Sequence, residues 1–169
     1  MPLVSVIIPV YKAEEFIRKC VGSVMAQTLQ DIEIICVDDG STDACPGILD
    51  EYAARDERVR VIHKPNGGYG KAVNTGMDAA RGEYFAILES DDVIRPGMYE
   101  RLYALAREHD LDVVKADYER FTTDPSGEIK PVYTKLSNWP DMYGRVIEDD
   151  PVTVLYRAGL YTWSGLYRL

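Results

Sequence analysis

From residue 3 to about residue 118, short apolar runs alternate with stretches that repeat apolar residues at helical spacing. The short runs are rich in Val and Ile, and such nearly continuous runs are typical of strands buried on both faces of a parallel sheet. Strands are predicted over residues 4–9, 32–37, 59–63, 84–88 and 112–118. Helices are predicted between them, over residues 14–27, 43–55, 70–80 and 96–109. The alternation predicts an α/β fold, an open, mostly parallel sheet with helices on both faces.

The pattern weakens beyond Phe121. Residues 123–130 are predicted to form a polar turn, and residues 132–168 hold short ambiguous elements with many aromatic side chains. A length of 169 residues suits one domain with a full core. The chain stops at Leu169, directly after an apolar stretch, so we expect a single domain over residues 1–169 that is truncated at its C-terminus.

The sequence shows no pattern typical of a signal peptide or of paired cysteines. The apolar start has no basic region before it, so a signal peptide is not expected. Cys20 and Cys36 stand among apolar residues and are predicted to be buried core thiols. Together with Cys45 they make an odd, scattered set, which favours a reducing, cytoplasmic location.

The charge balance narrows the range of partners. The formal net charge is -9, with a sequence pI of about 4.7. Such a surface repels the phosphates of nucleic acid, so binding of DNA or RNA is not expected. A protein of this charge that handles a small phosphate compound needs a metal ion or a few local hydrogen-bond donors.

Polar side chains follow several predicted strands at the point where each strand ends. Residues 38–41 are Asp-Asp-Gly-Ser, residues 63–66 include His, Lys and Asn, and residues 89–92 are Glu-Ser-Asp-Asp. Tyr11 follows the first strand. Because open parallel sheets bind ligands outside the carboxyl ends of their strands, these groups are candidates for one binding site.

Asp38 and Asp39 allow two interpretations. Asp-Asp-Gly-Ser is favourable turn chemistry, and either carboxylate could simply cap the next helix. Alternatively, one carboxylate accepts hydrogen bonds from a nucleoside, as acidic residues after a strand do in dinucleotide-binding folds.

Glu89, Asp91 and Asp92 place three carboxylates within four residues. A solvated turn would explain them, but their mutual repulsion would also be relieved by a divalent cation. Mg²⁺ and Mn²⁺ take oxygen ligands and commonly bridge one or two carboxylates to substrate phosphates.

The glycine-rich residues 67–71 are not a phosphate-binding loop of a known pattern. Pro65 stands where a Walker loop needs Gly, and Ala72 stands where it needs Ser or Thr. Lys71 could contact a diphosphate or be a solvated helix charge. His63 and His109 have no Ser or Cys in a recognisable arrangement, so a hydrolase triad is not supported.

Four segments taken together resemble glycosyltransferase family 2, the inverting enzymes of GT-A fold. They are Val-Ser-Val-Ile-Ile-Pro-Val-Tyr at residues 4–11, Val-Asp-Asp-Gly-Ser-Thr-Asp at residues 37–43, Asn-Thr-Gly at residues 74–76 with Ala-Ala-Arg-Gly-Glu-Tyr at residues 79–84, and Ser-Asp-Asp at residues 90–92. The match covers about residues 3–118, the expected donor-binding half, and leaves residues 119–169 as the start of an acceptor-side region.

The resemblance implies roles for the candidate residues. Pro9 and Tyr11 would line the nucleoside pocket, and Asp39, with Asp38 before it, would bind the base or ribose of a uridine diphosphate sugar. A second group would bind the diphosphate. Asp91 would contact both the donor and the cation, and Asp92 would bind Mg²⁺ or Mn²⁺. Lys71, which would contact the diphosphate, occupies a position where many relatives carry Arg.

The same resemblance implies the chemistry. An acceptor hydroxyl, from a saccharide or a lipid-linked glycan, would displace the nucleoside diphosphate with inversion. The family's catalytic base would lie beyond Leu169, with Asp117, Asp141 and Asp149 as weaker candidates within the chain. A lipid-linked acceptor would place the full-length protein at the inner face of the membrane.

Two other functions stay open at this point. A sugar-1-phosphate nucleotidyltransferase has a related sheet, but its glycine-rich loop after the first strand is absent from residues 10–15. A nucleotide-sugar-binding or interaction domain without catalysis is the other alternative.

Overall fold

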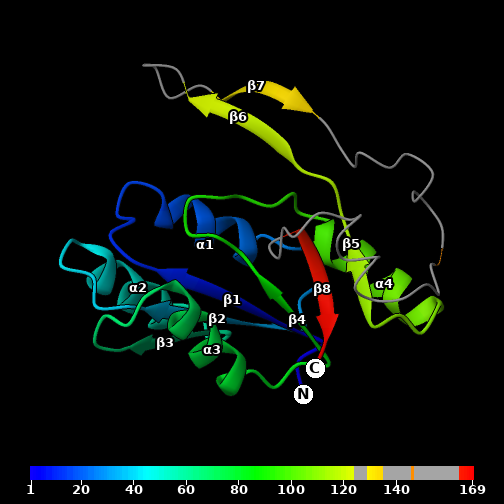
Figure 1. Cartoon of the computed structure of the whole chain (residues 1–169), viewed down its shortest axis with the longest axis horizontal. Helices are drawn as coiled ribbons and strands as arrows, with labels where there is room; N and C mark the ends of the chain where they lie inside the picture. The colour runs from blue at the N-terminus through cyan, green and yellow to red at the C-terminus, as the bar shows by residue number, and fades with distance from the viewer. Residues whose placement is uncertain (124–128, 135–145, 147–163) are drawn as a thin grey trace.

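The computed structural model describes residues 1–123, 129–134, 146 and 164–169. Its main feature is a six-stranded sheet (Figure 1). The strands of this sheet are β1 (Val4–Val10), β2 (Ile32–Asp38), β3 (Val59–His63), β4 (Tyr84–Ile87), β5 (Val113–Lys115) and β8 (Gly165–Arg168). Their order across the sheet is β3-β2-β1-β4-β8-β5.

Parallel pairing dominates the sheet. β1 pairs in parallel with both β2 and β4, and β2 pairs in parallel with β3. All seven residues of β1 and all seven of β2 are buried, as their continuous apolar runs predict. β8 lies antiparallel between β4 and β5, so the chain returns to the main sheet near its C-terminal end. The mostly parallel sheet predicted from the sequence is confirmed.

Helices cover both faces of this sheet. They are α1 (Ile17–Met25), α2 (Cys45–Ala53), α3 (Tyr69–Ala79) and α4 (Met98–Glu108). Buried residues of α1, α2 and α4 form one core with Val4, Val6 and Ile8 of β1. Ala72 of α3 packs on the opposite face, against Ile35 and Val37 of β2. Figure 1 shows α1 and α3 on opposite sides of β1.

The ends of the helices differ from those predicted. α1 begins at Ile17 rather than at residue 14, and Phe16, which falls within the predicted helix, is 48% exposed. The carboxylate of Asp43 accepts the N–H of Cys45, the first residue of α2, at 3.1 Å, and the N–H of Glu14 at 3.2 Å. Asp43 therefore supports the start of α2 and also holds the segment that leads into α1.

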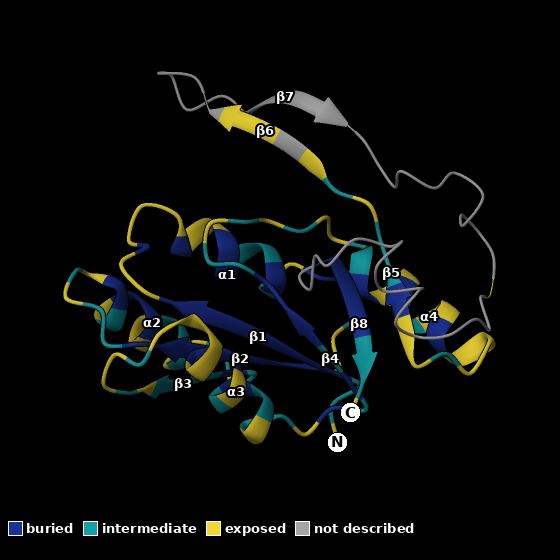
Figure 2. Cartoon of the chain, viewed as in Figure 1, coloured by how far each residue is buried: buried dark blue, intermediate teal, exposed yellow. Residues whose placement is uncertain are grey.

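The predicted fifth strand is shorter than expected. β5 ends at Lys115, and after a short connection the chain enters β6 (Glu119–Thr123), which pairs with β7 (Ile129–Thr134) in a separate two-stranded antiparallel sheet. The turn predicted over residues 123–130 is therefore partly wrong, because β7 already includes Ile129; residues 124–128 lie outside the described part. Figures 1 and 2 show this hairpin standing apart from the main sheet.

Two predictions about composition also meet the structure. Cys20, Cys36 and Cys45 are free thiols and all three are buried, which confirms Cys20 and Cys36 as core residues. In the described segments, no helix combines the length and the apolar character needed to cross a bilayer.

Candidate functional site

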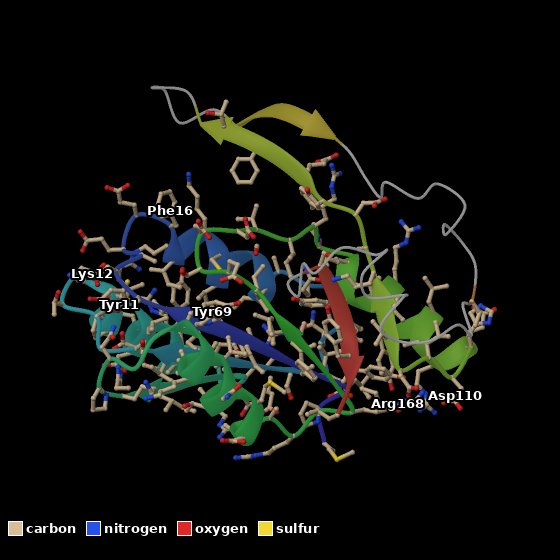
Figure 3. The ribbon with its side chains drawn as sticks, in the orientation of Figure 1. Tyr11, Lys12, Phe16, Tyr69, Asp110 and Arg168 are labelled. Atoms are coloured by element: carbon tan, nitrogen blue, oxygen red, sulfur yellow. The ribbon has the colours of Figure 1, made fainter. Side chains whose placement is uncertain are left out.

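The carboxyl ends of the parallel strands bring the predicted site residues to one edge of the sheet. The register pairs Val10 of β1 with Asp38 of β2, and Asp38 with His63 of β3. The segments that follow these strands therefore start side by side. Figure 3 shows Tyr11 and Tyr69 on the half of the molecule toward which β1 points.

Asp38 is engaged by its own neighbours. It is buried at the end of β2, where its carboxylate accepts the N–H of Ser41 at 2.9 Å and lies 2.9 Å from Nδ1 of His63. The other ring nitrogen of His63 lies 3.1 Å from Asp50, and hydrogen bonds to Asp38 and Asp50 raise the pKa of His63. This is the turn role foreseen for the aspartate pair; a donor contact by Asp38 stays a prediction.

Asp39 organises the loop after β3. Its carboxylate is only 3% exposed and accepts hydrogen bonds from the Lys64 ammonium, from the N–H of Gly67 at 2.9 Å and from the N–H of Gly68 at 2.7 Å. Burial by itself raises the pKa of Asp39, but these three hydrogen bonds outweigh it and lower the pKa below its usual value. Lys64 is among the polar residues that follow the third strand, but its pairing with Asp39 was not predicted.

A glycine follows Asp39 because two loops meet there. Gly40 has φ +74°, and a Cβ atom on it would lie 2.8 Å from the backbone nitrogen of Asn66. The Asp-Asp-Gly-Ser segment is thus held against the loop of residues 64–68 both by backbone proximity and by the Asp39 carboxylate.

The three carboxylates after β4 lie in a tight turn. The N–H of Asp92 donates to the carbonyl of Glu89 at 3.0 Å. Burial, together with the charges of Asp91 and Glu89, raises the pKa of Asp92 to about 6. Burial also raises the pKa of Glu89, and Asp91 adds to that effect. The carboxylates therefore repel one another in the chain alone.

Tyr69, the first residue of α3, was not predicted as a site residue. Its hydroxyl donates to Glu89 at 2.6 Å, which partly offsets the rise in the pKa of Glu89. The loop held by Asp39 and the carboxylate turn after β4 are thereby joined.

The carboxylate oxygens at this turn are suitable ligands for a divalent cation. Carboxylate oxygens are the ligands that Mg²⁺ and Mn²⁺ prefer, and a positive ion would relieve the repulsion at Asp92. Across the segments that the structure describes, no three His, Cys, Asp or Glu side chains converge as metal ligands. Binding of a cation by Asp91 and Asp92 stays a prediction.

The remaining predicted donor residues are spread over the same edge. Tyr11 is exposed directly after β1, whereas Pro9 is buried within the strand. Lys71 is exposed in the first turn of α3. Of the weaker candidates for the base, Asp117 is exposed after β5, and Asp141 and Asp149 lie outside the described residues.

A shallow groove of about 400 Å³ lies at the opposite, amino-terminal edge of the sheet. It is lined by Glu33, Arg58 and Arg60 among others. Arg58 is paired with Asp56 at 2.7 Å, and Arg60 is paired with Glu33 at 3.0 Å. These charges are satisfied within the chain, so the groove does not compete with the carboxyl edge as a binding site.

The sequence model of Glycosyl transferase family 2 matches residues 5–155. The chain belongs to glycosyl transferase family 2. Among curated relatives, it is 39% identical to the uncharacterized glycosyltransferase EpsJ of Bacillus subtilis, over 99% of this chain and 48% of EpsJ. It is 45% identical to the putative glycosyltransferase EpsH of the same organism, over 99% of this chain and 47% of EpsH. The chain therefore spans about half the length of these curated relatives.

The solved structures agree with this family assignment. TarS 1-349 of S. aureus superposes with a TM-score of 0.74 at 26% identity, covering 99% of this chain and 47% of that chain. TarS 1-349 in complex with UDP-GlcNAc is 32% identical over 67% of this chain and 33% of that chain, with a TM-score of 0.62. The expected GT-A fold is confirmed.

Proposed function

We propose that this chain forms the donor-binding part of an inverting glycosyltransferase that acts in cell-surface glycan synthesis. The observation that carries this proposal is the link between Asp39 and the turn that contains Asp91 and Asp92. Asp39 holds the loop of residues 64–68, and Tyr69, which follows that loop, donates to Glu89 of the turn. A nucleoside at Asp39 and a diphosphate near Asp92 would together span that edge.

The unused acceptor capacity of Asp39 favours uridine. An ionised carboxylate has about four acceptor positions. Among the described residues, Oδ1 of Asp39 accepts from Lys64 and Gly67, whereas Oδ2 accepts from Gly68 alone. One position remains on Oδ2, which suits the single N3–H of uracil better than the two adjacent donors of guanine. The similarity to TarS, solved with UDP-GlcNAc, also supports a UDP-sugar.

A divalent cation, Mg²⁺ or Mn²⁺, completes the proposed donor site. Asp92 and Asp91 would hold it, and when bound it would stabilise the charge that develops on the leaving diphosphate. Tyr11 would contact the nucleoside, with Pro9 behind it in β1. Lys71, exposed at the start of α3, would add a positive charge near the diphosphate.

The acceptor hydroxyl is proposed to come from a saccharide or a lipid-linked glycan. We place the carboxylate that deprotonates it beyond Leu169, in the part of the relatives' length that this chain does not span. Action on a lipid-linked acceptor would bring the full-length protein to the cytoplasmic face of the membrane. Residues 1–169 would then be one GT-A-type domain, with acceptor contacts from about residue 119 onward.

The test is a calorimetric titration of UDP into the full chain with Mn²⁺ and, separately, with EDTA. We expect binding that requires the metal and is at least about tenfold weaker in Asp39→Asn and in Asp92→Asn, because each substitution removes a charged partner of the ligand. The control is Glu57→Gln, an exposed carboxylate at the amino-terminal edge of the sheet. Equal affinity for UDP and GDP would contradict the uridine assignment, and unchanged binding in Asp92→Asn would contradict the cation site.

A further inference from the structure

The hydrogen bond between Tyr69 and Glu89 joins two elements of the donor site and has no role in the function proposed above. Tyr69 opens α3 immediately after Gly67 and Gly68, whose N–H groups are fixed by Asp39. Its hydroxyl donates to Oε1 of Glu89 at 2.6 Å, a short bond of the charge-assisted kind. The bond links residues that are 20 positions apart in the chain.

Burial of the tyrosine ring does not explain this arrangement. The Tyr69 side chain is 52% exposed, so packing of its ring contributes little to the core. Phe would fill the same space without the hydroxyl. Tyr differs from Phe by its hydroxyl, and the hydroxyl of Tyr69 donates to the Glu89 carboxylate.

Glu89 belongs to the same turn as Asp91 and Asp92, the residues of the proposed cation site. The turn that brings the N–H of Asp92 to the carbonyl of Glu89 also places Glu89 within electrostatic reach of Asp91 and Asp92. A cation that bridges protein and nucleotide keeps only one or two protein carboxylates and takes its other ligands from phosphate and water. A third carboxylate would occupy a position that the diphosphate needs, and would repel the diphosphate as well.

We propose that Tyr69 is a positioning residue that holds Glu89 away from the cation, leaving Asp91 and Asp92 to bind it together with the nucleotide diphosphate. This inference rests on the proposed function. In this proposal Glu89 does not bind the cation, although Glu89 is the first carboxylate of the Glu-Ser-Asp-Asp segment. The hydroxyl of Tyr69 thereby favours binding of cation and nucleotide together over binding of the cation alone.

The experiment compares Tyr69→Phe with the unmodified full chain in two titrations, Mn²⁺ alone and UDP at saturating Mn²⁺. Freed from Tyr69, Glu89 would join the cation, so we expect Mn²⁺ alone to bind more tightly and UDP to bind about tenfold more weakly, the loss typical of one hydrogen bond to a charged group. Tyr52→Phe is the matched control, because the hydroxyl of Tyr52 in α2 donates at 3.1 Å to the carbonyl of Arg18 in α1, outside the proposed site. It should change neither titration.

Variants of Glu89 separate this role from a merely structural one. Because an amide is a poor ligand for Mn²⁺, Tyr69→Phe combined with Glu89→Gln should recover most of the affinity that Tyr69→Phe loses. A large loss in Glu89→Gln would make Glu89 a cation ligand and overturn the inference. Unchanged affinities in Tyr69→Phe, or no recovery in the double variant, would overturn it too. If the unmodified chain fails to bind UDP with Mn²⁺, the proposed function itself fails, which is a distinct result.

Discussion

The carboxylate of Glu33 accepts the backbone N–H of Arg81 at 2.6 Å, although the two residues are 48 positions apart. Glu33 is 7% exposed on β2, and the same oxygen accepts the hydroxyl of Ser5 at 2.7 Å. Its other oxygen accepts from Arg60 at 3.0 Å. A single buried carboxylate thus ties together β1, β2, β3 and the turn between α3 and β4.

Glu33→Gln should destabilise the fold markedly. The amide would place a donor against the groups that now donate to Glu33 and would leave Arg60 without its charge partner. We expect the free energy of unfolding to fall by about 2–4 kcal/mol, measured by urea denaturation. Glu51→Gln is the control, because Glu51 pairs with Arg18 at the exposed surface and its loss should cost less than about 1 kcal/mol. Equal losses in the two variants would contradict the role of Glu33.

Gly82→Ala should destabilise the fold through a steric clash at the same turn. A Cβ atom on Gly82 would lie 2.7 Å from the Ser5 nitrogen and 2.8 Å from the Ser5 Oγ. Because backbone must shift to relieve this contact, we expect a loss of about 1–3 kcal/mol in thermal or urea unfolding. At Gly47, within α2, no heavy atom lies within 4 Å of the added Cβ, so Gly47→Ala should stabilise the fold by about 0.5–1 kcal/mol.

His63 should make the stability of the fold depend on pH near neutrality. Its pKa is raised above the ordinary 6.5 by hydrogen bonds to Asp38 and Asp50, so the folded state holds the proton more tightly than the unfolded state. This contribution is complete below about pH 6.5 and is lost as the pH rises through the higher pKa of the folded state. Because the ring is 43% exposed, the loss should stay below about 1 kcal/mol.

The measurement for His63 is the free energy of unfolding between about pH 6 and pH 9. His63→Gln should flatten the decline seen in the unmodified chain. His109→Gln, at the exposed end of α4, should leave the decline unchanged. A decline of the same size in both variants would show that another group is responsible.

Asp92→Asn should stabilise the chain in the absence of divalent cations. The pKa of Asp92 is raised from 3.8 to about 6, so the ionised carboxylate is unfavourable in the fold and stability increases as the pH falls through about 6 toward 3.8. Removing the charge at pH 8 in EDTA should raise the free energy of unfolding by about 1 kcal/mol, after allowance for partial exposure. This is the stability cost that functional sites commonly carry.

The cation should reverse the order of stability. Mn²⁺ should raise the thermal midpoint of the unmodified chain and leave that of Asp92→Asn almost unchanged, because only the former binds the ion. Glu57→Gln, at the amino-terminal edge of the sheet, should follow the unmodified chain under both conditions. An Asp92→Asn variant that is less stable than the unmodified chain in EDTA would contradict repulsion at this turn.

The sequence by itself determined the elements and the edge at which the site lies. Hydrophobic periodicity is a local property, so the buried strands, the amphipathic helices and the mostly parallel sheet followed from it. Parallel strands place their carboxyl ends together, so the sequence alone predicts that Asp39 and Asp92 lie at one edge of the sheet. Helical spacing did not predict where α1 begins, because Phe16 fits that spacing but lies in the turn before the helix.

Only the tertiary structure decided which side chains meet across that edge. Asp38 and Asp39 cannot be told apart in the sequence. In the structure, Asp38 contacts Ser41 and His63, whereas Asp39 accepts backbone N–H groups of the loop after β3. The short β8 lies between β4 and β5. Both partner strands are far from it in the sequence, so a local pattern does not predict this pairing. The bonds from Tyr69 to Glu89 and from Arg81 to Glu33 have the same origin. Periodicity records which face of an element is buried, whereas partners far apart in sequence are set by how the elements pack.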